Sequence, residues 1–241
     1  MLSHDDRLRY HQQGFLGPLP LALPLDASPG DLLGRIAPIV DAGSDITGHG
    51  TYARHLDSRP IFDLCTDPAV VEAVRLVLGD DLLLWNSSFW IKRDDAPPTP
   101  WHQDVHYWPA PLTVTAWIAL TDTDESSGCL ILIPGSHLGI LALAPAPPGA
   151  LFEFETDNSQ VPADEAVAVP AKAGEFILLS DRMLHRSAAQ VDTERWGLAA
   201  RFTVPFVYLP PDRLPLWAGH FSVLVSGVDR FGLNRTGPAP L

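Results

Sequence analysis

The sequence has few cysteines, a shortage of basic residues and no long apolar run. Its two cysteines, Cys65 and Cys129, exclude a disulfide framework and a cysteine-rich metal cluster. Only 16 Lys and Arg stand against 29 Asp and Glu, a net charge of −13 that argues against nucleic-acid or anionic-membrane partners. The apolar run Leu16–Leu25 is too short for a bilayer and contains three prolines. Because residues 1–13 are too polar for a signal peptide, we expect a cytoplasmic protein without a membrane partner.

The length and composition are those of one globular unit. A chain of 241 residues with 46% hydrophobic residues can bury a full core, and no repeat or long linker interrupts it. We expect a single domain over residues 1–241. It comprises a helical part at about 1–80, a β-rich core at about 82–207 and a tail at 208–241.

Helix start and stop signals are concentrated in the first third. Ser3 and Asp6 resemble a capping box for a short helix that ends near Gly14. A second helix is predicted to begin near Asp31. The clearest helix covers 67–78, with Asp67 as its N-cap, Pro68 at the first helical position and Gly79 just beyond its end.

From residue 82 onward, short β-prone runs alternate with turn residues. Many short strands after a helical beginning predict a mainly β protein with flanking helices, a cupin-like double-stranded β-helix or jelly roll. Two long irregular stretches, 43–60 and 144–164, are expected to be surface loops at the barrel mouth. The predicted strands are Leu82–Lys92, Thr113–Thr121, Cys129–Ile133, Glu165–Val169, Glu175–Ser180 and Gly197–Val207.

The segment around His102 is a candidate metal-binding motif. In an extended chain, side chains two residues apart share a face, so His102 and Asp104 point the same way. One imidazole and one carboxylate supply two of the three ligands of a non-haem Fe(II) facial triad, which a distant histidine completes. The motif alone is also typical of a surface pair or of satisfied hydrogen-bonding residues.

Residues further along the chain strengthen the metal-site interpretation. His185 follows a predicted strand, and Arg195 begins the next one. Along that strand Arg195, Gly197, Ala199 and Arg201 lie on one face, whereas the opposite face is bulky and apolar. An arginine inside a barrel is unfavourable unless it meets an anion, and its fork matches a carboxylate.

The order of these motifs resembles the phytanoyl-CoA dioxygenase (PhyH) family of Fe(II)- and 2-oxoglutarate-dependent oxygenases. The resemblance covers nearly the whole chain. It is carried by Tyr10–Phe15, Trp101–Asp104, Trp117–Leu120, Gly128–Leu130, Ile133–His137, His185 with Ser187, and Arg195.

The resemblance implies a cofactor, a co-substrate and their ligands. His102, Asp104 and His185 would be the catalytic iron ligands. Arg195 with Ser187 would bind the distal carboxylate of 2-oxoglutarate, and Trp117 and Asn86 would line the co-substrate. A small-molecule substrate would be oxidised by O₂ while 2-oxoglutarate yields succinate and CO₂. Because a halogenating branch replaces the Asp with a small residue, Asp104 favours hydroxylation.

Substrate-binding residues are predicted around the same motif. Trp90, Tyr107 and Trp108 flank the metal-binding segment as possible pocket walls, and His106 shares its face. Arg201 either meets an anionic group of the substrate or forms a structural ion pair. The substrate is expected to be a small metabolite or a natural-product intermediate.

Two other functions remain open from the sequence. A zinc hydrolase could use His102, Asp104 and His106, three possible ligands on one extended face. That interpretation leaves His185 and Arg195 without a role. A catalytically inactive jelly roll that only binds a ligand is the second alternative, because fold does not guarantee function.

Overall fold

The structure, a computed structural model, describes residues 2–22, 29–44, 50–93, 96–107, 110–148, 150–190, 193–211 and 219–241. Within these ranges all the α-helices precede strand β2. The helices are α1 (His4–Gln13), α2 (Pro29–Asp41), η1 (Arg54–Leu56), α3 (Arg59–Cys65), α4 (Pro68–Leu78), η2 (Asp104–His106), η3 (Ser136–Leu138), η4 (Asn158–Gln160) and η5 (Ala163–Glu165). The strands are β1 (Phe15–Pro20), β2 (Leu82–Lys92), β3 (Val114–Ala119), β4 (Leu130–Leu132), β5 (Leu143–Pro145), β6 (Phe154–Thr156), β7 (Val167–Val169), β8 (Glu175–Ser180), β9 (His185–Ser187), β10 (Arg195–Thr203) and β11 (Val223–Ser226).

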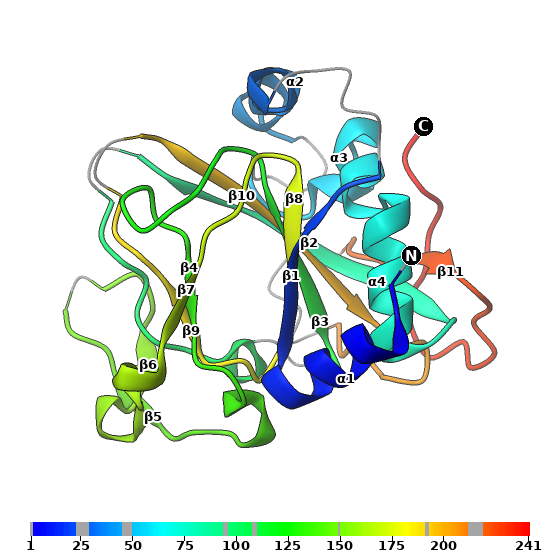
Figure 1. Cartoon of the computed structure of the whole chain (residues 1–241). Helices are drawn as coiled ribbons and strands as arrows, with labels where there is room; N and C mark the ends of the chain where they lie inside the picture. Colours follow the sequence, from blue (N-terminus) through cyan, green and yellow to red (C-terminus); the bar gives the residue numbers. More distant parts are fainter. Residues whose placement is uncertain are drawn as a thin grey trace.

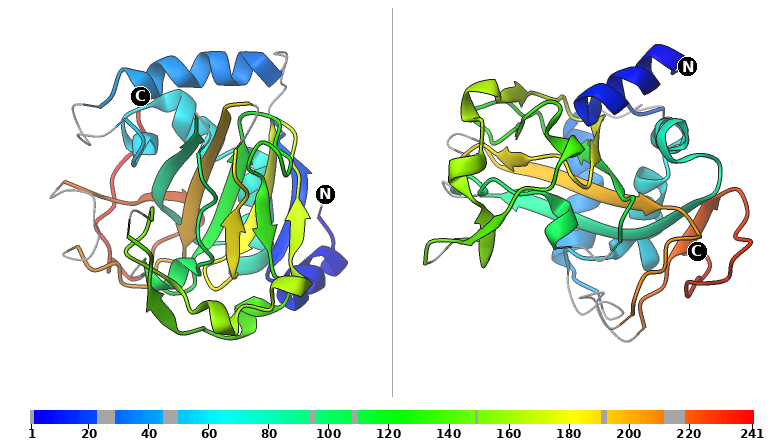
Figure 2. Two further views of the ribbon diagram at one scale, coloured as in Figure 1. Left: turned by 90° about the vertical axis from the view of Figure 1, so that its left-hand side faces the viewer. Right: turned by 90° about the horizontal axis from the view of Figure 1, so that it is seen from below.

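Two antiparallel sheets of described strands form the body of the protein. The major sheet has the order β1-β8-β3-β10-β2-β11, and the minor sheet has the order β7-β4-β9. In Figure 1 the minor sheet lies on one side of the major sheet, and helices α3 and α4 lie on the other. Figure 2 shows the same layers from two further directions, and in Figure 1 the two-stranded sheet of β5 and β6 lies at the lower end of the minor sheet. The architecture is a double-stranded β-helix with flanking helices, which confirms the predicted fold class.

Strand β10 illustrates how a two-residue period separates the core from the site. Trp196, Leu198 and Phe202 are buried in the large apolar cluster between the major sheet and the helices. Ala199 belongs instead to a cluster between the two sheets, together with Trp117. The alternate side chains of β10 therefore face the space between the sheets, as the sequence pattern predicted.

The helix ends follow the predicted capping chemistry. Ser3 forms a capping box with Asp6, and helix α1 ends at Gly14, whose φ of 83° is left-handed. The Asp67 side chain caps α4 by accepting from the Ala69 backbone N–H, and Gly79 is the C-cap. Among the described residues, no helix is both long and apolar enough to cross a membrane.

Some elements differ from the prediction. Strand β1 interrupts the predicted helical part and pairs with β8, while β11 lies in the predicted tail and pairs with β2. Both are edge strands of the major sheet, where the prolines of β1 can be accommodated. The predicted surface loop 43–60 is also partly wrong, because η1 within it is buried.

Candidate metal centre

Three potential metal ligands come together between the two sheets. The backbone N–H groups of His102 and His185 each donate to the other residue's carbonyl at 3.0 Å, so that the His102 segment lies beside β9. The two imidazole centroids are 4.1 Å apart. One ligand atom from each of His102, Asp104 and His185 lies within 4.8 Å of the others, and all three residues are buried. The described part of the chain contains no other such group of three.

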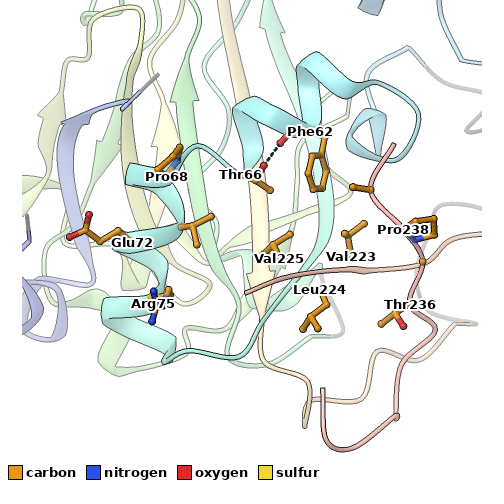
Figure 3. A pocket seen from close by; sticks show the side chains of 13 residues that line it. Phe62, Thr66, Pro68, Glu72, Arg75, Val223, Leu224, Val225, Thr236 and Pro238 are labelled. Atoms are coloured by element: carbon orange, nitrogen blue, oxygen red, sulfur yellow. Dashed lines mark hydrogen bonds between the residues drawn. The ribbon is translucent and has the colours of Figure 1, made fainter. Parts of the chain in front are cut away.

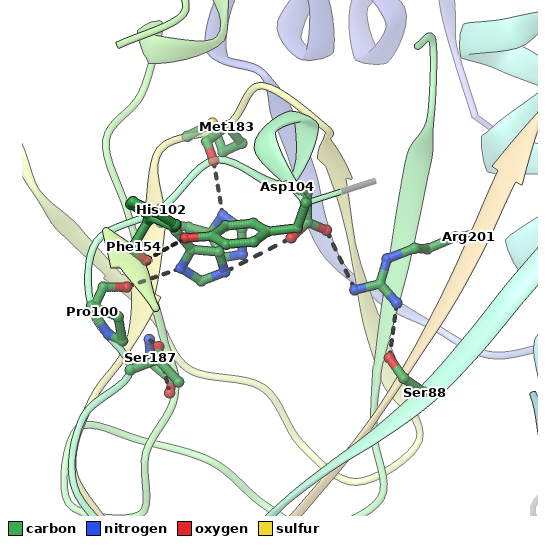
Figure 4. Close-up of polar contacts among 11 residues, drawn as sticks. Ser88, Pro100, His102, Asp104, Phe154, Met183, Ser187 and Arg201 are labelled. Atoms are coloured by element: carbon green, nitrogen blue, oxygen red, sulfur yellow. Dashed lines mark hydrogen bonds and ion pairs between the residues drawn. The ribbon is translucent and has the colours of Figure 1, made fainter. Parts of the chain in front are cut away.

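Hydrogen bonds set the orientation of both imidazoles (Figure 4). Nδ1 of His102 lies 2.9 Å from the Pro100 carbonyl, and Nδ1 of His185 lies 2.8 Å from the Met183 carbonyl. Because a carbonyl only accepts, each Nδ1 carries the proton, and each Nε2 keeps a lone pair for a metal. Burial and the neighbouring His185 lower the pKa of His102 to about 3, which keeps its ring neutral at pH 7.

The third ligand, Asp104, is held in its charged form. Burial alone would raise the pKa of its carboxyl, but the Arg201 guanidinium and the two imidazoles together lower it below its usual range. Two imidazoles and one carboxylate, with room for further ligands, are the donor set of a non-haem iron facial triad. The residues present therefore fit Fe(II).

A cavity of about 180 Å³ adjoins the cluster. Its lining includes five of the other residues that the sequence singled out: Trp90, Trp117, Ser187, Arg195 and Arg201. Arg195 is buried and donates from Nε to the Gly128 carbonyl at 3.0 Å and from a terminal nitrogen to the Trp90 carbonyl at 3.1 Å. Its guanidinium carbon lies 5.3 Å from the centre of the Trp117 ring, a cation–π contact that holds the fork beside the cavity.

Other predicted site residues do not line this cavity. Asn86 is fully buried outside the lining, and its amide has no hydrogen-bond partner among the described residues. His106 lies 3.0 Å through Nε2 from the Leu141 carbonyl, and the metal cluster contains His185 in its place. The alternative zinc set with His106 is therefore not favoured. Tyr107 donates to the Phe154 carbonyl at 2.6 Å, and Trp108 lies outside the described residues.

Lys92 and Phe152 are lining residues that the sequence did not assign to the site. Lys92 is buried at the end of β2, directly opposite Arg195 in the strand register. Phe152, from the predicted loop 144–164, packs edge-on against His102 with ring centroids 4.9 Å apart. Lys92 shares the strand parity of Trp90, which was a usable signal. No local pattern distinguishes Phe152 from its neighbours, because its contact with His102 depends on how the loop folds back.

Gly197 is required for the contact between Arg195 and Trp117. A Cβ at this position would lie 2.4 Å from a carbon of the Trp117 ring. We expect Gly197→Ala to displace that ring and to lower the free energy of unfolding by about 1–3 kcal/mol, as overpacking does. Thermal and chemical denaturation measure the change. Gly34→Ala is the matched control, because a Cβ in α2 at that site meets nothing within 4 Å. Equal stability of the two variants would contradict the prediction.

A larger hollow, of about 1160 Å³, lies away from the metal cluster. It is bounded by α3, α4, β11 and the C-terminal segment, with Phe62, Val223 and Pro238 among its walls (Figure 3). Glu72 and Arg75 are the charged residues of its lining. It contains none of the three ligand residues, so the smaller cavity is the candidate site.

Comparisons with known proteins identify a matching family. A family model described as Phytanoyl-CoA dioxygenase (PhyH) matches residues 38–194, a range that contains all three ligand residues and ends directly before Arg195. The human peroxisomal phytanoyl-CoA dioxygenase is 30% identical over 92 residues, which are 35% of this chain and 27% of the human protein. The ectoine dioxygenase of Nocardia farcinica is 28% identical over 156 residues, 57% of this chain and 52% of that protein. This chain thus spans about a quarter to a half of the length of these relatives.

The fold is also shared with solved structures. CytC3, solved with Fe(II) and alpha-ketoglutarate, superposes with a TM-score of 0.71 at 24% identity. The superposition covers 98% of this chain and 93% of CytC3. At this level of identity the likeness establishes the common fold.

Proposed function

We propose that this chain, which belongs to the phytanoyl-CoA dioxygenase family, is an Fe(II)- and 2-oxoglutarate-dependent oxygenase. One observation carries the proposal: the buried cluster of His102, Asp104 and His185 opens onto the cavity that Arg195 lines. A metal ligand set and an anion-binding arginine in one cavity are what this co-substrate requires.

The protein's own residues hold and shield the metal. His102, Asp104 and His185 bind Fe(II), and the Pro100 and Met183 carbonyls keep both imidazoles in the metal-binding tautomer. When bound, the iron and 2-oxoglutarate supply the oxidising power that breaks a substrate C–H bond, with succinate and CO₂ as co-products. The apolar walls around the cluster exclude water from this chemistry.

The distal carboxylate of 2-oxoglutarate binds to Arg195. The fork of Arg195 is already oriented by the Gly128 and Trp90 carbonyls and by the Trp117 ring, so binding costs little side-chain freedom. Ser187 lines the same cavity and shares this carboxylate. Burial lowers the pKa of Arg195 to about 10, a value at which it remains charged at neutral pH.

The substrate is a small molecule that approaches the metal past Trp90 and Phe152. These rings lie 6.1 Å apart, and Leu151 beside them is largely exposed at the cavity rim. Apolar walls and an intact Asp104 favour hydroxylation of an unactivated C–H bond. A cytoplasmic location, expected from the sequence, would keep the ferrous ion reduced.

Succinate formation tests the activity directly. We expect purified protein with Fe(II), ascorbate and O₂ to convert 2-oxoglutarate into succinate slowly, because substrate-free oxygenases turn over uncoupled, and faster with a substrate. Succinate is measured by mass spectrometry. Zinc-loaded protein is the control and should form none, because zinc does not support redox chemistry. Absence of both succinate formation and 2-oxoglutarate binding would support the inactive jelly-roll alternative.

Lys92 makes co-substrate affinity depend on pH. Burial and the facing Arg195 lower the pKa of Lys92 to about 8, and a bound carboxylate would raise it again. The affinity for 2-oxoglutarate is therefore highest below pH 8, where Lys92 is already protonated. It falls above pH 8, because Lys92 must then take up a proton when 2-oxoglutarate binds. We expect the Kd of 2-oxoglutarate, measured calorimetrically with Mn(II), to rise by up to about tenfold per pH unit between pH 8 and 9.5. Arg195, with its pKa at about 10, stays mostly charged across this window.

Lys92→Met is the matched variant for this experiment. It should weaken 2-oxoglutarate binding at pH 7 and flatten the pH dependence between pH 8 and 9.5. An unchanged profile in Lys92→Met would show that another group titrates.

A further inference from the structure

Arg201 connects the candidate metal ligand to the major sheet. It lies on β10 with only 2% of its surface exposed. One terminal nitrogen donates to Oγ of Ser88 on β2 at 2.8 Å, and the other lies 3.4 Å from Oδ2 of Asp104 (Figure 4). The guanidinium therefore lies between a fixed strand residue and the carboxylate.

The two oxygens of Asp104 have different surroundings. Oδ1 faces the ligand cluster, 3.8 Å from Nε2 of His102. Oδ2 faces Arg201 on the opposite side. Because a guanidinium attracts and orients the oxygen nearest to it, Arg201 leaves Oδ1 as the oxygen available to a metal.

Apart from Arg201, little holds the Asp104 carboxylate in position. Asp104 begins the single turn η2, which follows the bridge between His102 and His185 and is not part of either sheet. In the described part of the chain, Arg201 is the one side chain that hydrogen-bonds to its carboxylate. A carboxylate on a short turn can rotate, and a buried charge without a counter-charge is strongly unfavourable.

We infer that Arg201 is a positioning residue of the metal centre: it presents Asp104 as a one-oxygen ligand and compensates its charge. A carboxylate that gives only one oxygen would leave more of the bound metal available to other ligands. The inference rests on one part of the proposed function, namely that the cluster binds a divalent metal. The alternative, that Arg201 binds an anionic substrate, is less compatible with a guanidinium whose two terminal nitrogens already contact protein groups.

Metal affinity is the direct readout. We expect Arg201→Gln to weaken Mn(II) binding, measured by calorimetric titration, by about 10–100-fold, the usual cost of losing a residue that orients a metal ligand. Arg201→Lys should lose less, because it keeps the charge but not the fork. Ser88→Ala should give a smaller loss, because it frees the guanidinium without removing it.

The matched control is Arg54→Gln. Arg54 of η1 and the C-cap residue Asp57 form another buried ion pair, at 2.9 Å, outside the lining of the cavity. This variant should lose stability but keep wild-type Mn(II) affinity, so that a general folding defect is distinguished from a loss of positioning. Wild-type Mn(II) affinity in Arg201→Gln would overturn the inference. The same result with a raised substrate KM would assign Arg201 to a substrate anion instead.

Chemical rescue gives an independent test. Asp104→Gly leaves Arg201 facing an unfilled space, where added formate can replace the carboxylate. Formate should restore Co(II) binding, followed by its visible absorption, in Asp104→Gly but not in Asp104→Gly with Arg201→Gln. Equal rescue of both variants would overturn the inference. If wild type binds Mn(II) tightly but neither binds nor consumes 2-oxoglutarate, the proposed function fails while the role of Arg201 stands.

Discussion

Replacing His185 with Ala is expected to abolish 2-oxoglutarate turnover and to weaken Fe(II) binding by more than about 100-fold, beyond what changes around the ligands cause. His185 supplies one of three ligand atoms that lie within 4.8 Å of one another. Its Nδ1 hydrogen-bonds to the Met183 carbonyl, which leaves the Nε2 lone pair for the metal. No other described His, Cys, Asp or Glu completes the cluster. Calorimetric titration with Mn(II) and a succinate assay measure the two effects.

His106→Ala is the matched control. It removes an imidazole two residues from Asp104 that contacts the Leu141 carbonyl. Metal affinity should therefore remain within a few-fold of wild type, and succinate formation should persist. Loss of metal in His106→Ala with retention in His185→Ala would restore the zinc-site alternative and contradict the iron-site proposal.

Replacing Arg195 with Met is expected to raise the Kd of 2-oxoglutarate by about 30-fold to several thousand-fold, equivalent to about 2–5 kcal/mol for a buried charge pair. Arg195→Lys should also lose affinity, because an ammonium cannot reproduce two parallel hydrogen bonds and would lose the contact with the Trp117 ring. Mn(II) affinity in the absence of 2-oxoglutarate should stay unchanged, since Arg195 does not contact the ligand residues. Calorimetry with Mn(II) measures both affinities.

The control for this experiment is Arg93→Lys. Arg93 lies just beyond β2, is about half exposed and pairs with Glu194 on the surface, so a charge-conserving change there should leave co-substrate binding intact. Unchanged 2-oxoglutarate affinity in both Arg195 variants would contradict the proposed role of Arg195. The distal carboxylate would then have to be held elsewhere, with Lys92 as the next candidate.

Local sequence signals predicted much of the fold. Strands β2 and β8 have the bounds expected from their β-prone runs, and α4 lies between its predicted caps Asp67 and Gly79. These elements carry strong propensity and clear turn residues at both ends. Strand β9, from His185 to Ser187, was not predicted as a strand, because its three residues are extended through pairing with β4. Strand β1 was missed because its prolines are tolerated only at a sheet edge.

The candidate site, like the fold, was predicted only in part from the sequence. Spacing predicted that His102 and Asp104 point the same way, and the structure brings them together although the segment turns into η2 at Asp104 and does not stay extended. Alternation along β10 placed Arg195 and Arg201 on one face of that strand. The partner of Arg201 was left open between a substrate anion and an acidic side chain. The structure brings Asp104 to it from a turn 97 residues away in the chain. No local pattern contains such a contact.

The sequence by itself determined which chemical groups are available and which face of each strand they occupy, because side-chain direction follows the local backbone period. Only the tertiary structure decided which groups meet. The register of β10 against β2 sets Arg195 opposite Lys92, and the bridge between His102 and His185 brings the imidazoles together. Both depend on pairing between segments far apart in the chain, which is settled by burying the whole core at once and not by any local preference.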